Sequence, residues 1–276
     1  MVDCASFKKM VPNHFNQLSL PYLTHQLDAI PAADIHLCAP TVLGYSFACK
    51  KWGRLDVDRF AEIVWNTDAF DHLVLEEEKK ILIKSLVCAE RTEMITDVIS
   101  GKAGGSIVIL HGNPGTGKTL TAEAAAEKGK RPLMVVCAAE LASRAADLEE
   151  YLGSILEICE DWGAVLLIDE AEAYLETRSI GDVKRNAMVS VFLRLLEYHQ
   201  QVIFLTTNHI TRIDPAFKSR ISVAIKYPEL DENARETIWA RFLKMAGVQI
   251  HDTPGPQSIT KAELAELVKK KMNGRL

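Results

Sequence analysis

Runs of apolar residues alternate with amphipathic stretches between residues 107 and 225. The runs are Ile107–Leu110, Leu133–Cys137, Ala164–Glu170, which ends in two acids, and Val202–Thr206, with a fifth strand expected at Ile221–Ile225. Strands this uniformly apolar are typical of a parallel sheet whose two faces are both covered by helices. We therefore predict an α/β fold of three layers (αβα) with a five-stranded parallel sheet.

The stretches between these runs carry apolar residues at helical intervals. Helices are expected at Glu76–Ser100, from near Gly117 to Lys128, and at Asp147–Glu160, Val183–Tyr198, Asp214–Arg220, Asp231–Gly247 and Lys261–Met272. Before residue 76 the pattern is weaker: Thr41–Lys50 favours a strand and Asp56–Trp65 a short helix or a strand–helix junction. We divide the chain into an N-terminal region of unclear fold (1–66), an αβα core (67–229) and a partial C-terminal helical region (230–276).

A glycine-rich turn joins the first apolar strand to the next helix. It reads Gly112-Asn113-Pro114-Gly115-Thr116-Gly117-Lys118-Thr119 and matches the pattern G-x-x-x-x-G-K-[ST]. The backbone N–H groups of such a loop cradle phosphate oxygens at a helix N-terminus. Lys118 is then placed to reach the β- and γ-phosphates, Thr119 to take a Mg²⁺ position, and Leu120 to extend the contact. A chance match is the alternative, but the strand before and the helix after favour a nucleotide site.

Polar residues follow two of the other strands. Asp169 and Glu170 end one of them, and Asn208 follows another. Because ligands bind at the carboxyl ends of parallel strands, we expect these residues beside the glycine-rich turn. Asp169 is placed to hold Mg²⁺ through its waters, Glu170 to orient and deprotonate the attacking water, and Asn208 to bind that water or a γ-phosphate oxygen. The alternatives are two solvated acids at a strand end and an asparagine that closes a turn.

Arg220 is expected at the rim of the sheet, after a short helix. An exposed arginine is usually a surface charge that contributes little. At this rim, however, the arginine of a neighbouring subunit can reach a γ-phosphate and stabilise charge in the transition state. We therefore group Arg220 with Glu170 and Asn208 as candidate catalytic residues.

Composition narrows the function classes. The 276 residues are 48% hydrophobic with a net charge of −5, which indicates a globular chain and gives no support for nucleic-acid binding. No run of 18 apolar residues predicts a membrane span, and no apolar core follows Lys8 and Lys9 as in a secretory signal. The six scattered cysteines lack C-x-x-C spacing, so we expect reduced thiols and a cytoplasmic location.

Four motifs together carry a family resemblance. The motifs occur in the order G-N-P-G-T-G-K-T, L-L-I-D-E-A-E, T-T-N and I-D-P-A-F-K-S-R-I. Over Asp68–Phe242 the chain resembles the P-loop AAA+ ATPases of the AAA clade. Three further stretches are similar to uncharacterised AAA-family proteins of fungi: Y-S-F-A-C-K-K-W, W-G-A-V-L-L-I-D-E-A-E and R-N-A-M-V-S-V-F-L-R-L-L-E-Y. The resemblance implies hydrolysis of ATP with Mg²⁺ in a homo-oligomeric, hexameric ring that remodels a protein partner. It assigns Lys118 and Thr119 to nucleotide and metal, Asp169 and Glu170 to the Walker B pair, Asn208 to the sensor and Arg220 to the arginine finger.

The resemblance also implies that Asp68–Leu73 frames the adenine and that the C-terminal helices form a lid (230–276). Two features depart from the family pattern. Glu140–Asp147 has no aromatic residue where many relatives carry one in a pore loop, and the chain stops at Asn273–Leu276, where relatives continue with more helix. We therefore expect a truncated lid. The alternative function is a nucleotide-binding switch or assembly module that hydrolyses little ATP.

Overall fold

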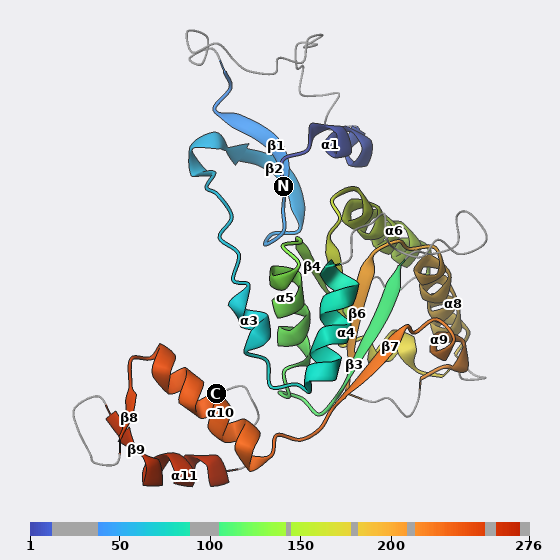
Figure 1. Cartoon of the computed structure of the whole chain (residues 1–276). Helices are drawn as coiled ribbons and strands as arrows, with labels where there is room; N and C mark the ends of the chain where they lie inside the picture. The colour runs from blue at the N-terminus through green and yellow to red at the C-terminus, as the bar shows by residue number, and fades with distance from the viewer. Residues whose placement is uncertain are drawn as a thin grey trace. The chain divides into compact units, whose positions relative to one another are not determined.

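The computed structural model describes residues 1–12, 38–88, 105–141, 145–177, 182–208, 213–251 and 258–270. The chain divides into two compact units, Met1–Val64 and Trp65–Leu276 (Figure 1). No helix in these described segments combines the length and the apolar content that a bilayer crossing requires.

The first unit is built on an antiparallel hairpin of β1 (Thr41–Ser46) and β2 (Lys51–Asp56), with α1 (Cys4–Met10) beside it. The ring of Trp52 packs edge-on against those of Phe7 and Tyr45, with ring centroids 5.5 and 5.3 Å apart. This aromatic cluster supplies the buried centre of the unit. The strand predicted within Thr41–Lys50 is therefore confirmed as far as Ser46.

Of the two forms predicted for Asp56–Trp65, the structure has the strand–helix junction: β2 ends at Asp56 and a single 3₁₀ turn, η2 (Val57–Arg59), follows it. A short helix over the whole stretch is not formed. After that turn the chain runs without regular structure to residue 66. Ile63 and Val64 are 71% and 93% exposed. A short helix is stable mainly through burial of an apolar face, and these side chains do not bury one.

The second unit contains the predicted five-stranded sheet, which is confirmed. Its strands are β3 (Ser106–Gly112), β4 (Leu133–Cys137), β5 (Val165–Asp169), β6 (Val202–Thr207) and β7 (Val223–Tyr227). Their order is β4-β5-β6-β3-β7 and every pairing is parallel. β3, which leads into the glycine-rich turn, therefore lies between β6 and β7. The last strand begins two residues later than predicted, after Ser222, whose N–H donates to the Ile107 carbonyl at 2.9 Å.

Helices cover both faces of this sheet (Figure 1). One face carries α4 (Glu77–Cys88) and α5 (Lys118–Lys128), and the other carries α6 (Ala145–Asp161), α8 (Val183–Glu197) and α9 (Pro215–Lys218). The buried alanines of α5 let that helix lie close to β3 and β5. α4 confirms the first half of the helix predicted at Glu76–Ser100, while residues 89–100 lie outside the described residues.

Short elements complete the second unit. α3 (Asp68–Asp71) precedes α4, and α7 (Glu172–Leu175), which the sequence pattern did not predict, follows β5. Cys159 in α6 is fully buried, and burial raises the pKa of its thiol to about 12, so this cysteine is a core residue.

The C-terminal segment that is expected to form a lid, and is called the lid below, contains α10 (Glu232–Met245), β8 (Gln249–His251), β9 (Ser258–Thr260) and α11 (Lys261–Lys269). Arg235 joins its parts, because its guanidinium donates to the Leu230 carbonyl at 2.5 Å and to the Val268 carbonyl at 2.7 Å. Both predicted lid helices are confirmed, whereas the parallel β8–β9 pair was not predicted. The C-terminal Asn273–Leu276 and residues 142–144 of the expected pore loop lie outside the described residues.

Candidate active site

The glycine-rich turn runs from the end of β3 directly into α5. Gly112 has φ 150°, and a Cβ at this position would lie 2.3 Å from the Tyr227 carbonyl oxygen, so only glycine fits here. Gly117 is the N-cap of α5 with φ 95°, a left-handed conformation. The first N–H groups of a helix have no partner within the helix, and the helix dipole adds positive potential there. The turn therefore offers an anion-binding site at the start of α5.

Lys118 places a positive charge at the centre of this turn. Its ammonium group is buried and donates to the carbonyls of Gly112 and Asn113 at 2.8 Å each, and to Oδ1 of Asn208 at 3.0 Å. Burial, and then the nearby charges of Lys226 and Lys118, lower the pKa of His111. The same positive field that disfavours a charged histidine favours a bound anion such as a phosphate.

The acidic side of the site lies at the end of β5. The Thr119 hydroxyl donates to Oδ1 of Asp169 at 3.2 Å. Glu170 follows in a left-handed conformation, φ 57°. Its exposed side chain lines the same cavity in the protein as Lys118 and Thr119. Burial, and then the charge of Asp169, raise the pKa of Glu123 one helical turn after Thr119. Neighbouring hydroxyl and carboxylate oxygens with excess negative charge are a donor set that fits Mg²⁺.

Asn208 connects the end of β6 to both sides of the site. Its side-chain oxygen accepts from Lys118, and its backbone N–H donates to Oε1 of Glu172 at 2.6 Å. The sequence reasoning missed Glu172, although its signal was present as the third acid of D-E-A-E. Asn208 is thus held by both its backbone and its side chain next to the phosphate loop.

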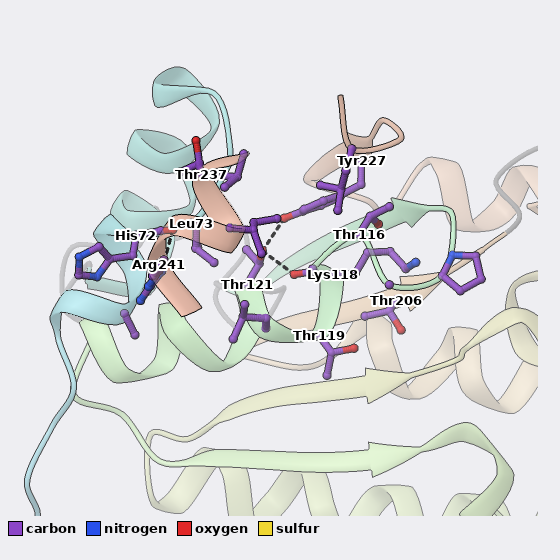
Figure 2. A pocket seen from close by; sticks show the side chains of 18 of the residues that line it. His72, Leu73, Thr116, Lys118, Thr119, Thr121, Thr206, Tyr227, Thr237 and Arg241 are labelled. Atoms are coloured by element: carbon purple, nitrogen blue, oxygen red, sulfur yellow. Dashed lines mark hydrogen bonds between the residues drawn. The ribbon is translucent and has the colours of Figure 1, made fainter. Parts of the chain in front are cut away.

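One cavity of about 630 Å³ is lined by Lys118, Thr119, Asp169, Glu170 and Asn208 together. Figure 2 shows its walls: Thr116, Lys118 and Thr119 come from the turn and α5, and Arg241 and Thr237 come from α10. Its polar end is formed by Pro114 to Thr121, Asp169, Glu170, Thr206 and Asn208. A largely pre-formed cavity of this size is typical of a small-molecule site.

The opposite end of the cavity is apolar and lies between the segment after α3 and the lid. Leu73, Val74, Ile238 and Phe242 line it. The guanidinium of Arg241 on α10 donates to the His72 carbonyl at 3.0 Å and so ties the lid to this segment (Figure 2). None of the α10 residues was predicted to be part of the site, because they follow the last recognised motif.

Tyr227, at the end of β7, forms part of the wall beside the turn. Its hydroxyl donates to Oγ1 of Thr121 at 2.7 Å, and burial raises the pKa of this phenol to about 12. Tyr227 is therefore a neutral group at physiological pH. Its side chain supports α5, while its carbonyl closes the space over Gly112.

Arg220 does not line this cavity. Its guanidinium forms an ion pair with Glu197 of α8, 2.8 Å apart, and donates to the Ala216 carbonyl at 2.7 Å. The structure thus brings together Lys118, Thr119, Asp169, Glu170 and Asn208. It leaves Arg220 outside the cavity of its own chain.

Comparison with known proteins agrees with this arrangement. Residues 108–229 match the family described as "ATPase family associated with various cellular activities (AAA)". Protein CdcH of Halobacterium salinarum is 32% identical over 140 residues, which are 48% of this chain and 19% of that protein.

Two insect proteins are also similar. The ATPase family AAA domain-containing protein 3A homolog of Drosophila melanogaster is 26% identical over 61% of this chain and 28% of that protein. Spastin of Drosophila persimilis is 24% identical over 74% of this chain and 26% of that protein. The chain therefore spans less than a third of the length of each of these three relatives. Taken with the phosphate loop and the acids that face it, the match identifies residues 108–229 as an ATPase domain of the AAA family.

Proposed function

We propose that this chain hydrolyses ATP in the presence of Mg²⁺ and couples hydrolysis to the remodelling of a protein partner within a ring oligomer. The observation that carries the proposal is the meeting of Lys118, Thr119, Asp169, Glu170 and Asn208 at one end of one cavity. Phosphoryl transfer to water needs little covalent chemistry from the protein, so positioning and charge stabilisation account for most of the catalysis.

In this proposal the backbone N–H groups of residues 112–119 and the Lys118 ammonium bind the β- and γ-phosphates. Thr119 and Asp169 hold Mg²⁺, which neutralises phosphate charge when bound. Glu170 orients the attacking water and accepts its proton. Asn208 donates its amide N–H to that water or to a γ-phosphate oxygen, while its own oxygen faces Lys118.

The adenine is proposed to lie at the apolar end of the cavity. Asp68–Leu73 contributes Ala69, His72 and Leu73 to this end, and α10 contributes Ile238 and Phe242. Mainly apolar side chains from these two segments suit a purine ring. The bound base thereby contacts the core and the lid together.

The ring is proposed because Arg220 lies outside the cavity of its own chain. An arginine supplied by a neighbouring subunit provides the missing cation at the γ-phosphate. We propose the chain as one subunit of such a homo-oligomer, hexameric by its resemblance to the family, with a protein and not a nucleic acid as its substrate. We also propose that the chain divides into three parts at residues 66 and 229, that it is related to the AAA-family proteins of fungi and that it is cytoplasmic.

Steady-state turnover tests the proposal. We expect the purified chain to hydrolyse ATP only when Mg²⁺ is present, and Glu170→Gln to lower kcat by about 100-fold or more, because a general base contributes roughly that much. Binding of a fluorescent ADP analogue should stay unchanged. Glu149→Gln is the matched control, since Glu149 pairs with Arg194 on the exposed surface of α6 and α8.

One result would refute hydrolysis: an unsubstituted chain that binds ATP but turns over no faster than Glu170→Gln. That result would favour the nucleotide-binding switch instead.

A further inference from the structure

Thr206, the first residue of the T-T-N motif, is a buried hydroxyl in the wall of the cavity to which the family resemblance assigns no role. It lies in β6, two residues before Asn208, and is 2% exposed. Figure 2 shows it on the same side of the cavity as Lys118 and Thr119. A buried hydroxyl is costly unless it forms hydrogen bonds, so its partners indicate its role.

The Thr206 hydroxyl contacts both acids at the end of β5. It donates to Oδ1 of Asp169 in a short hydrogen bond, and it accepts the backbone N–H of Glu170 at 2.9 Å. An ionised carboxylate is only an acceptor and a backbone N–H is only a donor, so the single hydroxyl proton must face Asp169. One oxygen atom therefore fixes the carboxylate of one acid and the backbone of the next.

These bonds replace the regular sheet ladder where it stops. The β5–β6 pairing ends at Ile168 and Leu205, one residue before Asp169 and Thr206. Beyond that point the Thr206 hydroxyl holds Glu170, and the Thr206 carbonyl accepts the N–H of Ala171 at 2.9 Å. Thr206 thus anchors each of the three residues that follow Ile168.

The anchored backbone is strained at Glu170. A non-glycine residue rarely adopts a left-handed conformation and keeps it only where its surroundings impose it. Glu170 has φ 57°, and its N–H bond to Thr206 is one of the contacts that impose this conformation. Without the hydroxyl, Glu170 can relax and aim its carboxylate elsewhere.

We propose that Thr206 is a positioning residue that holds the Asp169 carboxylate for the metal and the Glu170 backbone for proton transfer. This inference rests on the proposed function, because it assigns Thr206 a role in the same site. It predicts that the affinity of the site for Mg²⁺ depends on the Thr206 hydroxyl and not on the volume of the side chain.

The test compares Thr206→Val, which keeps the shape and removes the hydroxyl, with Thr206→Ser, which keeps the hydroxyl. Binding of a fluorescent ATP analogue is titrated with Mg²⁺, and kcat is measured in parallel. We expect Thr206→Val to raise the Mg²⁺ midpoint and lower kcat by about tenfold each, as for other partners of metal ligands. Affinity for the analogue in EDTA should be unchanged, and Thr206→Ser should resemble the unsubstituted chain.

An unchanged Mg²⁺ midpoint in Thr206→Val would overturn the inference, as would equal losses in the Val and Ser variants. If the valine variant does not fold, Thr206→Ala removes the same hydroxyl, places no methyl group where the hydroxyl was, and is measured in its place. The Mg²⁺ titration is a binding measurement. A chain without turnover would therefore refute hydrolysis and still leave Thr206 tested by its Mg²⁺ midpoint.

Discussion

At the scale of single residues, the burial of His199 makes the stability of the core depend on pH. It follows α8, is 5% exposed, and its Nδ1 lies 2.5 Å from the Leu196 carbonyl oxygen. Burial is the main reason that its pKa lies below the usual value, although backbone hydrogen bonds at Leu196 and Ser106 act in the opposite direction. A Cβ on Gly105 would lie 2.6 Å from the imidazole ring, so the ring has little room to move toward water.

The stability of the second unit should therefore fall as the pH drops below about 6.5, the ordinary pKa of histidine. In that range the unfolded chain takes up a proton that buried His199 resists, so the free energy of unfolding decreases. We expect Tm to fall less between pH 7.5 and 5.5 in His199→Gln than in the unsubstituted chain. His251→Gln, at an exposed lid position, is the control and should keep the full dependence. Equal slopes in all three proteins would contradict this account.

Sequence motifs predicted a set of residues for phosphate and metal binding, and the structure places these residues, Lys118, Thr119, Asp169, Glu170 and Asn208, around one cavity. Their residue types and spacing follow directly from phosphate chemistry. Residues such as Thr206 act through hydrogen bonds to other side chains and backbone groups. Threonine is common in strands because of its strand propensity alone. The sequence therefore does not distinguish Thr206 from an ordinary strand residue, whereas its hydrogen bonds in the structure do.

At the scale of elements, α10 combines packing within the lid with contact to the nucleotide cavity. None of its residues is buried, and Phe242 and Met245, which line the cavity, are 46% and 74% exposed. No fully buried side chain of α10 holds this helix in place, and the bond from Arg241 to the His72 carbonyl is a direct link between it and the segment after α3.

Replacement of Arg241 by methionine should weaken nucleotide binding by roughly fivefold, because losing one such hydrogen bond costs about 1 kcal/mol. The aliphatic part of the side chain is retained, so the wall of the cavity stays covered. Affinity for ADP, measured by calorimetry, tests this expectation, with Arg194→Met on α8 as the control. An affinity equal to that of the control would show that the tie does not hold the lid in place.

The main elements were predictable where burial determines them. The five apolar strands and the long helices follow from their hydrophobic pattern, since a buried face leaves a strong periodic signal. α7, β8 and β9 are only three or four residues long and carry no such period. The exposed apolar residues Phe60, Ile63 and Val64 suggested an amphipathic segment that the structure does not form.

At the scale of the whole molecule, the cavity and the proposed arginine finger do not meet within one chain. Lys118, Asp169, Glu170 and Asn208 line the cavity, whereas Arg220 is held away from it by Glu197 and by the Ala216 carbonyl. An ion pair of a partly exposed arginine is weak enough to exchange for a phosphate when a second subunit presents one. The proposed ring would bring the two parts together.

A mixing experiment decides whether Arg220 acts across an interface. Arg220→Ala and Glu170→Gln should each lower ATP turnover by roughly tenfold or more, since each removes a group that stabilises the transition state. Mixed in equal amounts, they should recover part of the activity. At some interfaces a chain with intact Glu170 then receives an intact Arg220 from its neighbour.

The control mixes Arg220→Ala with the double variant Arg220→Ala/Glu170→Gln, in which no chain offers an arginine, and this mixture should stay inactive. Size-exclusion chromatography with ATP present shows whether each mixture assembles. If the mixture of single variants assembles and remains as inactive as its components, Arg220 does not act on a neighbouring site. In that case its ion pair with Glu197 only stabilises the junction of α8 and α9.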